Sequence, residues 1–194
     1  KITGETTKSK INRLLKILKK KRIDNIFISA PENVAWLLNL RGKDNPNSPI
    51  PNCRLILTKN KKIYLFTDLK KIKKIKNIHE YKNLKFFMFS KFYFVLNRLK
   101  DKRFCVDQSS CSIFYESLIN SKFEIKSYID PCYQLKAIKN SVEINNMKSS
   151  HIDDGVALTK FLFWIKNHNL KNLSEIDVEK KLESFRKKNK NYIY

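Results

Sequence analysis

Three ionisable side chains that lie close together in the sequence, His151, Asp153 and Asp154, are of the types that hold a divalent metal. On a helix, His151 and Asp154 share a face because they are three positions apart, whereas Asp153 points elsewhere. Two ligands do not complete a zinc or manganese site, which needs a third protein ligand. We therefore interpret His151 as a structural histidine and predict no metal ligand in this chain.

The other sequence patterns that carry chemistry are incomplete. His79 is followed by Glu80 but not by the second histidine of an H-E-x-x-H zinc motif, and His168 lies in a polar helix end. A G-x-S-x-G nucleophile turn and a glycine-rich phosphate loop both need more glycine than this sequence has. The only glycines are Gly4, Gly42 and Gly155. We therefore predict no catalytic residue.

The four cysteines are scattered and form no C-x-x-C pair, and no histidine stands near them at a metal-binding spacing. A free cysteine behaves as a small hydrophobic residue in most folds. We predict reduced and mostly buried thiols at all four positions. They are Cys53, Cys105, Cys111 and Cys132.

Lysine dominates the net charge of +23. As a functional feature, this charge indicates binding to nucleic acid or to an anionic membrane. As a compositional feature, it accompanies abundant Ile and Asn, a combination that an AT-biased genome produces. Arginine, the residue that contacts bases with two hydrogen bonds, is sparse, and the lysines do not alternate with aromatic residues. Composition is the favoured explanation, and binding of nucleic acid or another polyanion is the alternative, which predicts lysines gathered on one face.

Length and composition indicate a globular protein. The 194 residues, 42% of them hydrophobic and 12% aromatic, leave room for one core, or for one core and a fragment of a second. No apolar run approaches the roughly 20 residues that a bilayer span needs, so we predict no membrane partner. The N-terminal stretch lacks the apolar middle of a signal peptide, and a cytoplasmic location is expected.

Apolar spacing predicts that helices and strands alternate as far as Pro131. This order is typical of an α/β fold in which a mixed or parallel sheet is flanked by helices. Ser29 and Glu32 predict a capping box for a helix that has Pro31 in its first turn and Trp36 as a large anchor. Strands are expected over 26–28, 55–57, 63–66, 86–89, 104–106 and 123–129, and helices over 6–22, 69–78, 92–99 and 113–119.

A long helix is predicted after Pro131, from an N-cap at Ser141 to Lys166. Ser174 and Asp177 then predict the start of a shorter amphipathic helix. Two helices cannot build a core alone. They need a partner layer, supplied either by the upstream domain or by further chain.

Two longer stretches resemble the aminopeptidase P family of Xaa-Pro aminopeptidases, which belong to the creatinase and pita-bread (M24) metallopeptidases. Residues 30–42, APENVAWLLNLRG, continued by KD to Asp44 and by a later NSP, resemble the central domain of that family. Residues 136–158, KAIKNSVEINNMKSSHIDDGVAL, resemble the entry into its catalytic domain. The hairpin over 55–66 and the FR pair at 185–186 fall in matching places.

This resemblance implies a creatinase N-terminal-like fold of ribonuclease-H-like topology over residues 1–132. It implies that residues 133–194 are the first two helices of a truncated pita-bread domain. Enzymes of the family remove the first residue of a peptide whose second residue is proline, using two divalent metals, usually manganese. The resemblance places the metal ligands and catalytic histidines beyond Tyr194, so the chain is expected to be inactive alone, with peptide substrate and a homodimer as the partners of the parent enzyme.

The loop from Arg41 to Asp44 is the best functional candidate within the chain, because loops on a rigid α/β scaffold often carry function. It follows the helix that bears Trp36. In the resembling family, N-terminal domains help to close the mouth of the active site. We predict that Arg41 and Asp44 make interdomain polar contacts, with a direct substrate contact as the less favoured role. A stand-alone interaction domain is the third functional alternative.

Overall fold

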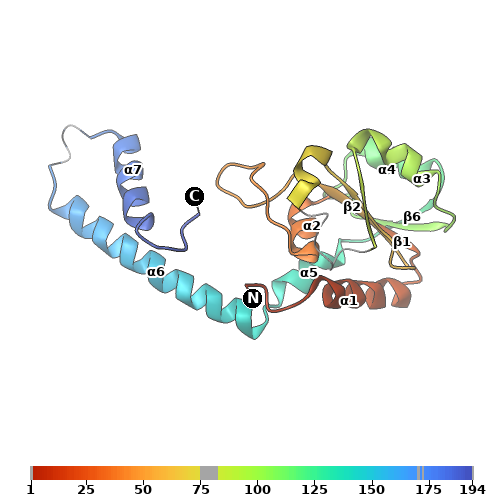
Figure 1. The fold of residues 1–194 in the computed structure, drawn as a ribbon, viewed down its shortest axis with the longest axis horizontal. Coiled ribbons are helices and arrows are strands. Elements are labelled where there is room, and N and C mark those ends of the chain that lie inside the picture. Colours follow the sequence, from red (N-terminus) through yellow and green to blue (C-terminus); the bar gives the residue numbers. More distant parts are fainter. Residues whose placement is uncertain (1, 75–82, 170, 172, 194) are drawn as a thin grey trace. The chain divides into compact units, whose positions relative to one another are not determined.

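The computed structural model describes residues 2–74, 83–169, 171 and 173–193. The chain divides into two compact units, and Figure 1 shows their elements coloured in chain order. One unit runs from Glu5 to Ile138, and the other joins the N-terminal residues up to Gly4 to the stretch that begins at Lys139. The domain boundary predicted after residue 132 stays a prediction, because a unit defined by contacts is not a test of independent folding.

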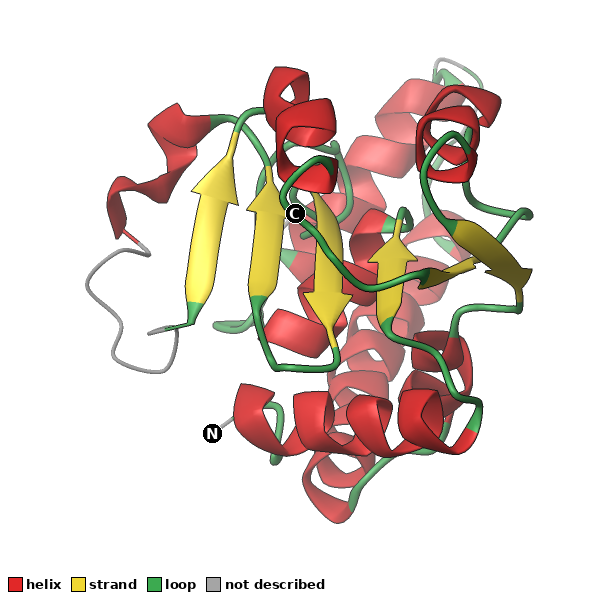
Figure 2. Cartoon of the chain, turned by 90° about the vertical axis from the view of Figure 1, so that its right-hand side faces the viewer, coloured by secondary structure: helices red, strands yellow, loops and turns green. Residues whose placement is uncertain are grey.

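A six-stranded mixed sheet forms the first unit, as the sequence predicts (Figure 2). Its strand order is β4-β3-β2-β1-β5-β6. Strand β2 runs antiparallel to both of its neighbours, β1 and β3, and every other adjacent pair of strands is parallel. The strands are β1 (Asn25–Ile28), β2 (Arg54–Thr58), β3 (Ile63–Phe66), β4 (Leu84–Phe87), β5 (Arg103–Val106) and β6 (Glu124–Ser127).

Each face of the sheet has its own hydrophobic core. Successive side chains of a strand point to opposite faces, so Ile26 and Ile28 join one core and Phe27 joins the other. Helices α1 (Thr7–Lys20), α2 (Pro31–Leu38) and α5 (Pro131–Ala137) pack in the first core. Helices α3 (Phe92–Leu96) and α4 (Ile113–Asn120) pack in the second, which is rich in aromatic rings. The result is the three-layer α/β/α architecture that the sequence pattern predicts.

The capping box predicted at Ser29 and Glu32 is wrong. The N-cap of α2 is Ala30, which makes no side-chain cap hydrogen bond, while Pro31 occupies the first turn as predicted. The Ser29 hydroxyl instead lies 2.8 Å from the hydroxyl of Ser110, and the carboxylate of Glu32 accepts a hydrogen bond from Tyr133. Both side chains of the expected capping box thus bind residues that are distant in the sequence.

Other boundaries shift by a few residues. The predicted helix over 69–78 is a 3-10 turn, η1 (Leu69–Lys74), and its last predicted residues lie outside the described part. The strand predicted over 86–89 ends at Phe87, because residues 89–91 form a second 3-10 turn, η3 (Phe89–Lys91). The short helix α5 has no counterpart among the predictions. Asp130 caps it through the Cys132 amide, so Pro131 begins a helix there as well as ending the preceding segment.

The second unit consists of α6 (Ser141–Lys166) and α7 (Glu175–Arg186). The N-cap of α6 is Asn140 and not Ser141, and Glu143 completes a capping box with it. The capping box predicted from Ser174 and Asp177 is confirmed at the start of α7. In the described parts of the chain, every helix is too short or too polar to cross a bilayer.

Candidate functional site

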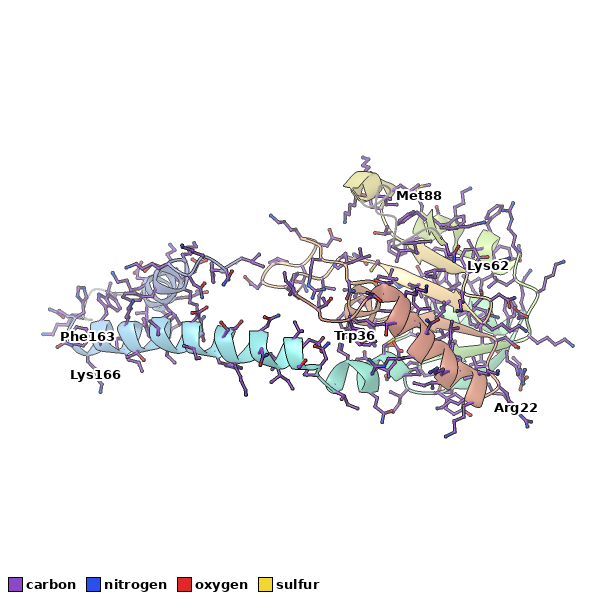
Figure 3. The ribbon with its side chains drawn as sticks, turned by 60° about the horizontal axis from the view of Figure 1, so that its bottom comes forward. Arg22, Trp36, Lys62, Met88, Phe163 and Lys166 are labelled. Atoms are coloured by element: carbon purple, nitrogen blue, oxygen red, sulfur yellow. The ribbon has the colours of Figure 1, made fainter. Side chains whose placement is uncertain are left out.

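Trp36 lies on α2 and packs against the core that α1 covers (Figure 3). Its ring is half-buried, and the ammonium of Lys10 lies 4.4 Å from the ring centroid. A cation at this distance over an indole is attracted by the electron-rich face of the ring. Trp36 therefore links α1 to the end of α2, directly before the candidate loop.

Lys10 is a residue of this region that the sequence analysis missed. Its side chain is buried, and the Nζ atom donates hydrogen bonds to the carbonyl of Trp36 (2.9 Å) and to Oδ1 of Asn39 (2.7 Å). The carbonyls at a helix C-terminus lack helical partners and carry the negative end of the helix dipole. The buried ammonium of Lys10 supplies a hydrogen-bond donor and a positive charge at this helix end, so Lys10 fixes the end of α2. The sequence does carry a signal for this role, because Lys10 stands beside Ile11 on the apolar face of its own helix.

Asn39 turns the chain from α2 into the loop. Its backbone is left-handed, with φ of 54°, a conformation that asparagine tolerates better than most residues. Its side-chain amide donates to the carbonyl of Glu5 at 2.9 Å. Arg41 follows on the surface, where one terminal nitrogen donates to the carbonyl of Leu40 at 2.7 Å. The guanidinium of Arg41 is therefore held near the backbone and faces solvent.

Asp44 anchors the far end of the loop within its own unit. Its carboxylate accepts the backbone N–H of Asn52 at 2.7 Å and forms an ion pair with Lys71. Lys71 first, and the Asn52 amide second, hold the pKa of Asp44 below its usual value. The described residues show no hydrogen bond that joins Trp36, Arg41 and Asp44 to one another. The three predicted residues thus share one loop region but have separate partners, and their interdomain role stays a prediction.

The region beyond the carboxyl ends of β1 and β5 is a second candidate for a site. These strands are parallel neighbours, and the helices that follow them lie on opposite faces of the sheet. Open α/β sheets bind ligands at such a switch point. In this protein Asp107, which follows β5, is buried and accepts the backbone N–H of Asp130 at 2.9 Å.

Asp130 and its neighbours occupy this region and bind one another. Its carboxylate accepts the Cys132 amide (2.9 Å) and the side-chain amide of Asn33 (2.7 Å), and Lys136 donates to Asn33 at 2.8 Å. Burial raises the pKa of Asp130, against the opposing effect of these hydrogen bonds. The buried side chains are hydrogen-bonded to one another, so the network holds α2, α5 and β5 together. Its geometry suits a structural junction and not a ligand site.

The cysteines are free, as predicted, and three of the four are buried, while Cys111 is half-buried. Burial raises the pKa of Cys53 and Cys105 to about 12 and that of Cys111 to about 11, and it raises the pKa of Cys132 as well. The thiolate is the nucleophilic form of cysteine. These thiols stay protonated at neutral pH and are unsuited to nucleophilic catalysis.

No group of three or more His, Cys, Asp or Glu side chains in the described part of the chain is placed to hold a metal ion. His151 is exposed on α6, and Asp154 on the same helix accepts hydrogen bonds from Arg186 of α7 at 2.7 and 3.3 Å. Asp154, the carboxylate that shares a helical face with His151, thus joins α6 to α7. The described residues do not fit a two-metal centre.

Comparison with known proteins gives a consistent result. The sequence matches the profile of the family described as "Creatinase/Prolidase N-terminal domain" over residues 1–143. It is 30% identical to Xaa-Pro aminopeptidase 1 of Dictyostelium discoideum, in an alignment that covers all of this chain and 31% of the relative. It is 31% identical to a probable Xaa-Pro aminopeptidase P of Paracoccidioides lutzii, over 98% of this chain and 33% of the relative.

Solved structures agree with these sequence relatives. An X-prolyl aminopeptidase from Caenorhabditis elegans, described as a cytosolic enzyme with a di-nuclear active site, superimposes with a TM-score of 0.86 and 26% identity. The match covers 99% of this chain and 32% of that one. An Xaa-Pro dipeptidase from Bacillus anthracis shares the fold at a TM-score of 0.72 and 18% identity, over 94% of this chain and 49% of that one. The chain spans about a third of the length of the Xaa-Pro aminopeptidases that it matches.

Proposed function

The chain belongs to the creatinase/prolidase N-terminal domain family, and on that premise we propose that it is the non-catalytic N-terminal portion of an Xaa-Pro aminopeptidase. The parent enzyme removes the first residue of a peptide whose second residue is proline. This portion shapes substrate access and docks on the catalytic body. It does no chemistry alone. The superposition of 99% of this chain on part of the C. elegans enzyme supports the proposal.

The observation that carries the proposal is how few of the residues in α6 and α7 are buried. Only Ala157 and Phe161 are buried on α6, and no residue is buried on α7. Large apolar side chains on both helices are exposed, among them Phe163 at 72%, Ile152 at 68% and Ile176 at 60%. Apolar surface of this kind marks an interaction site. It fits helices that open a larger domain, whose remaining layers would cover them.

The metals and substrate of the parent belong to that larger domain. Two divalent ions, manganese by the resemblance, would be held by residues outside the described part of this chain, which offers no metal-binding group of its own. The substrate would be a peptide with proline at its second position. A cytoplasmic location and a homodimeric parent complete the proposal. The location has support from the C. elegans relative, which is described as cytosolic.

A first experiment reads the coding sequence that follows Tyr194 and assays the protein it encodes. The proposal expects an ordered series of two aspartates, a histidine and two glutamates in the downstream chain. It also expects the extended protein to cleave an Xaa-Pro peptide when manganese is present. A stop codon directly after Tyr194, or an extended protein with no ligand series, would contradict the proposal.

The Trp36–Asp44 region would orient this portion over the catalytic body. Arg41 is suited to that role because it is exposed and pre-oriented by its bond to the Leu40 carbonyl. In the full-length parent, Arg41→Ala is expected to change peptidase activity or the melting temperature. Lys43→Ala, an exposed cation two residues away, serves as the control and should leave both unchanged. Unaltered kinetics and melting in the Arg41 variant would refute the interdomain role.

A further inference from the structure

A basic groove lies at the end of the sheet where β1 and β5 begin, opposite the end that holds Asp107 and Asp130. It has a volume of about 770 Å³, within the size range of small-molecule sites. The end of α1, the turn between β2 and β3, and the start of β5 enclose it, and Figure 2 shows that turn and α1 at the same edge of the sheet. Six cationic side chains and one carboxylate line it. The cations are Lys16, Lys19, Arg22, Lys59, Lys61 and Arg103, and the carboxylate is Asp24.

Two of these cations have an unusual backbone conformation. Among the described residues, four that are not glycine have a positive φ, and two of the four are asparagines, which tolerate it. The other two are Arg22 (φ 54°) and Lys61 (φ 62°), and both line the groove. Figure 3 labels Arg22 just beyond the end of α1. Glycine is the preferred residue at a helix end and at a hairpin turn of this geometry. Residues in sparsely populated backbone conformations cluster at functional sites.

Two further cations are fixed in place by ion pairs. Arg103 Nε lies 3.2 Å and Lys59 Nζ lies 3.1 Å from the carboxylate of Asp24, which is buried and lines the groove. Lys59 also pairs with Asp101 at 2.6 Å. These bonds hold both cations in position before any ligand arrives, which lowers the entropy that binding must overcome.

The remaining four cations, Lys16, Lys19, Arg22 and Lys61, have no ion-pair partner in the described part of the chain. Three apolar side chains also line the groove: Leu15 is half-buried, and Leu18 and Ile23 are only 1% and 3% exposed. A site that combines unpaired cations with an apolar contact suits a ligand that carries both an anionic group and an apolar or flat body.

We propose that this groove binds an organic phosphate of nucleotide size, with its phosphates held by Arg22, Lys61 and the lysines of α1 and its ring against Leu15. The proposal concerns a surface remote from the candidate loop and does not depend on the peptidase role. The groove brings together six of the 41 Lys and Arg residues of the chain.

The test measures binding of ATP to the 194-residue chain by isothermal titration calorimetry at constant ionic strength, with tripolyphosphate and adenosine as separate ligands. We expect ATP to bind more tightly than either part. In the double variant Arg22→Gly and Lys61→Gly, the affinity for ATP should fall about tenfold or more, because two charge-assisted contacts are lost. The melting temperature should stay the same or rise, because glycine relieves the positive φ at both positions.

A charge-matched control variant, Lys43→Gln and Lys85→Gln, removes two exposed lysines that do not line the groove and should bind ATP as the unmodified chain does. A second groove variant, Arg22→Asn and Lys61→Asn, keeps a residue that accepts positive φ and should lose affinity as the glycine variant does. An equal loss in the control would overturn the proposal, since binding would then follow net charge. So would tripolyphosphate binding as well as ATP, or binding of oligouridylate that ATP does not displace.

Discussion

Lys10 shows how one buried charge can organise a candidate site. It meets two acceptors at the end of α2 and lies against the ring of Trp36. Removing a charged partner leaves buried acceptors without hydrogen bonds, which costs more than the bond itself contributes. A lysine that lies on the apolar face of its helix is therefore a structural element and not a surface charge.

Lys10→Met should lower the free energy of unfolding by about 2 kcal/mol, because hydrogen bonds to charged groups are worth roughly 1.5–3 kcal/mol. Urea denaturation followed by circular dichroism measures the change. Lys8→Met, on the exposed side of the same helix, is the control and should change stability by less than about 0.5 kcal/mol. Equal effects in the two variants would show that the buried contacts contribute nothing.

Asp24 should make the stability of the first unit depend on pH. Burial acts to raise its pKa, but hydrogen bonds from Arg103 and Lys59 outweigh that effect and lower it below 3.8. A carboxylate with a lowered folded-state pKa contributes stability that is present above pH 3.8 and is lost as the pH falls through the folded value.

Asp24→Asn should therefore reduce stability at neutral pH by about 1 kcal/mol, because its partners are partly exposed. The difference from the unmodified chain should shrink as the pH falls below 3.8. Thermal melts from pH 7 to pH 2.5 would show the two curves approaching each other. A constant offset over that range would mean that Asp24 acts through packing and not through its charge.

The elements themselves are largely predictable, because hydrophobic spacing is a local property. The alternation of Ile26, Phe27 and Ile28 between two cores follows directly from the period of a strand. Capping is less predictable because it depends on competition. Ser29 has the right spacing for a cap, yet Ser110, 81 positions along the chain, is its partner. Helix α5 was missed because Pro131 reads equally well as an end and as a first turn.

Gly42 is the tightest point of the loop that carries Arg41 and Asp44. A β-carbon added at Gly42 would lie 2.6 Å from the Cα and Cβ atoms of Pro51, a contact that backbone and a rigid ring cannot relieve. Its N–H donates to the Pro49 carbonyl at 3.1 Å. The two sides of the loop, at Gly42 and at Pro51, are therefore in direct contact.

Gly42→Ala should push the loop apart and lower the melting temperature by several degrees, as a clash of about 1–3 kcal/mol would. Differential scanning calorimetry measures this change. Gly155→Ala is the matched control, because nothing lies within 4 Å of its added carbon, and alanine there should raise the stability of α6 slightly. A Gly42 variant as stable as the unmodified chain would mean that the loop yields without cost.

At the scale of the whole molecule, the two units have unequal cores. The first has a buried core on each face of its sheet, whereas α7 has no buried residue. Amide hydrogen exchange in the 194-residue chain should show slow exchange in β1 and β2 and fast exchange in α7, because protection follows burial. Comparable protection in α7 and in the sheet would contradict the account of α6 and α7 as the exposed opening of a larger domain.

The family was accessible from the sequence only through resemblance. Spacing alone puts His151 and Asp154 on one helical face without a third ligand and so predicts no metal site, and the structure pairs Asp154 with Arg186. Net charge was equally ambiguous, because composition does not show which cations meet in space. The basic groove depends on Arg22 and Lys61, which are 39 positions apart and are brought together by the end of α1 and a hairpin turn.

The most direct test of the central claim is a peptidase assay on the 194-residue chain alone, with an Xaa-Pro peptide and added manganese, beside calorimetric titration of manganese. The account predicts no cleavage above the blank without protein and no stoichiometric manganese binding, because the described residues offer no metal-binding group. A relative such as the C. elegans enzyme serves as the positive control. Cleavage of the Xaa-Pro bond by this chain alone would contradict the claim that the chemistry belongs to the rest of the parent enzyme.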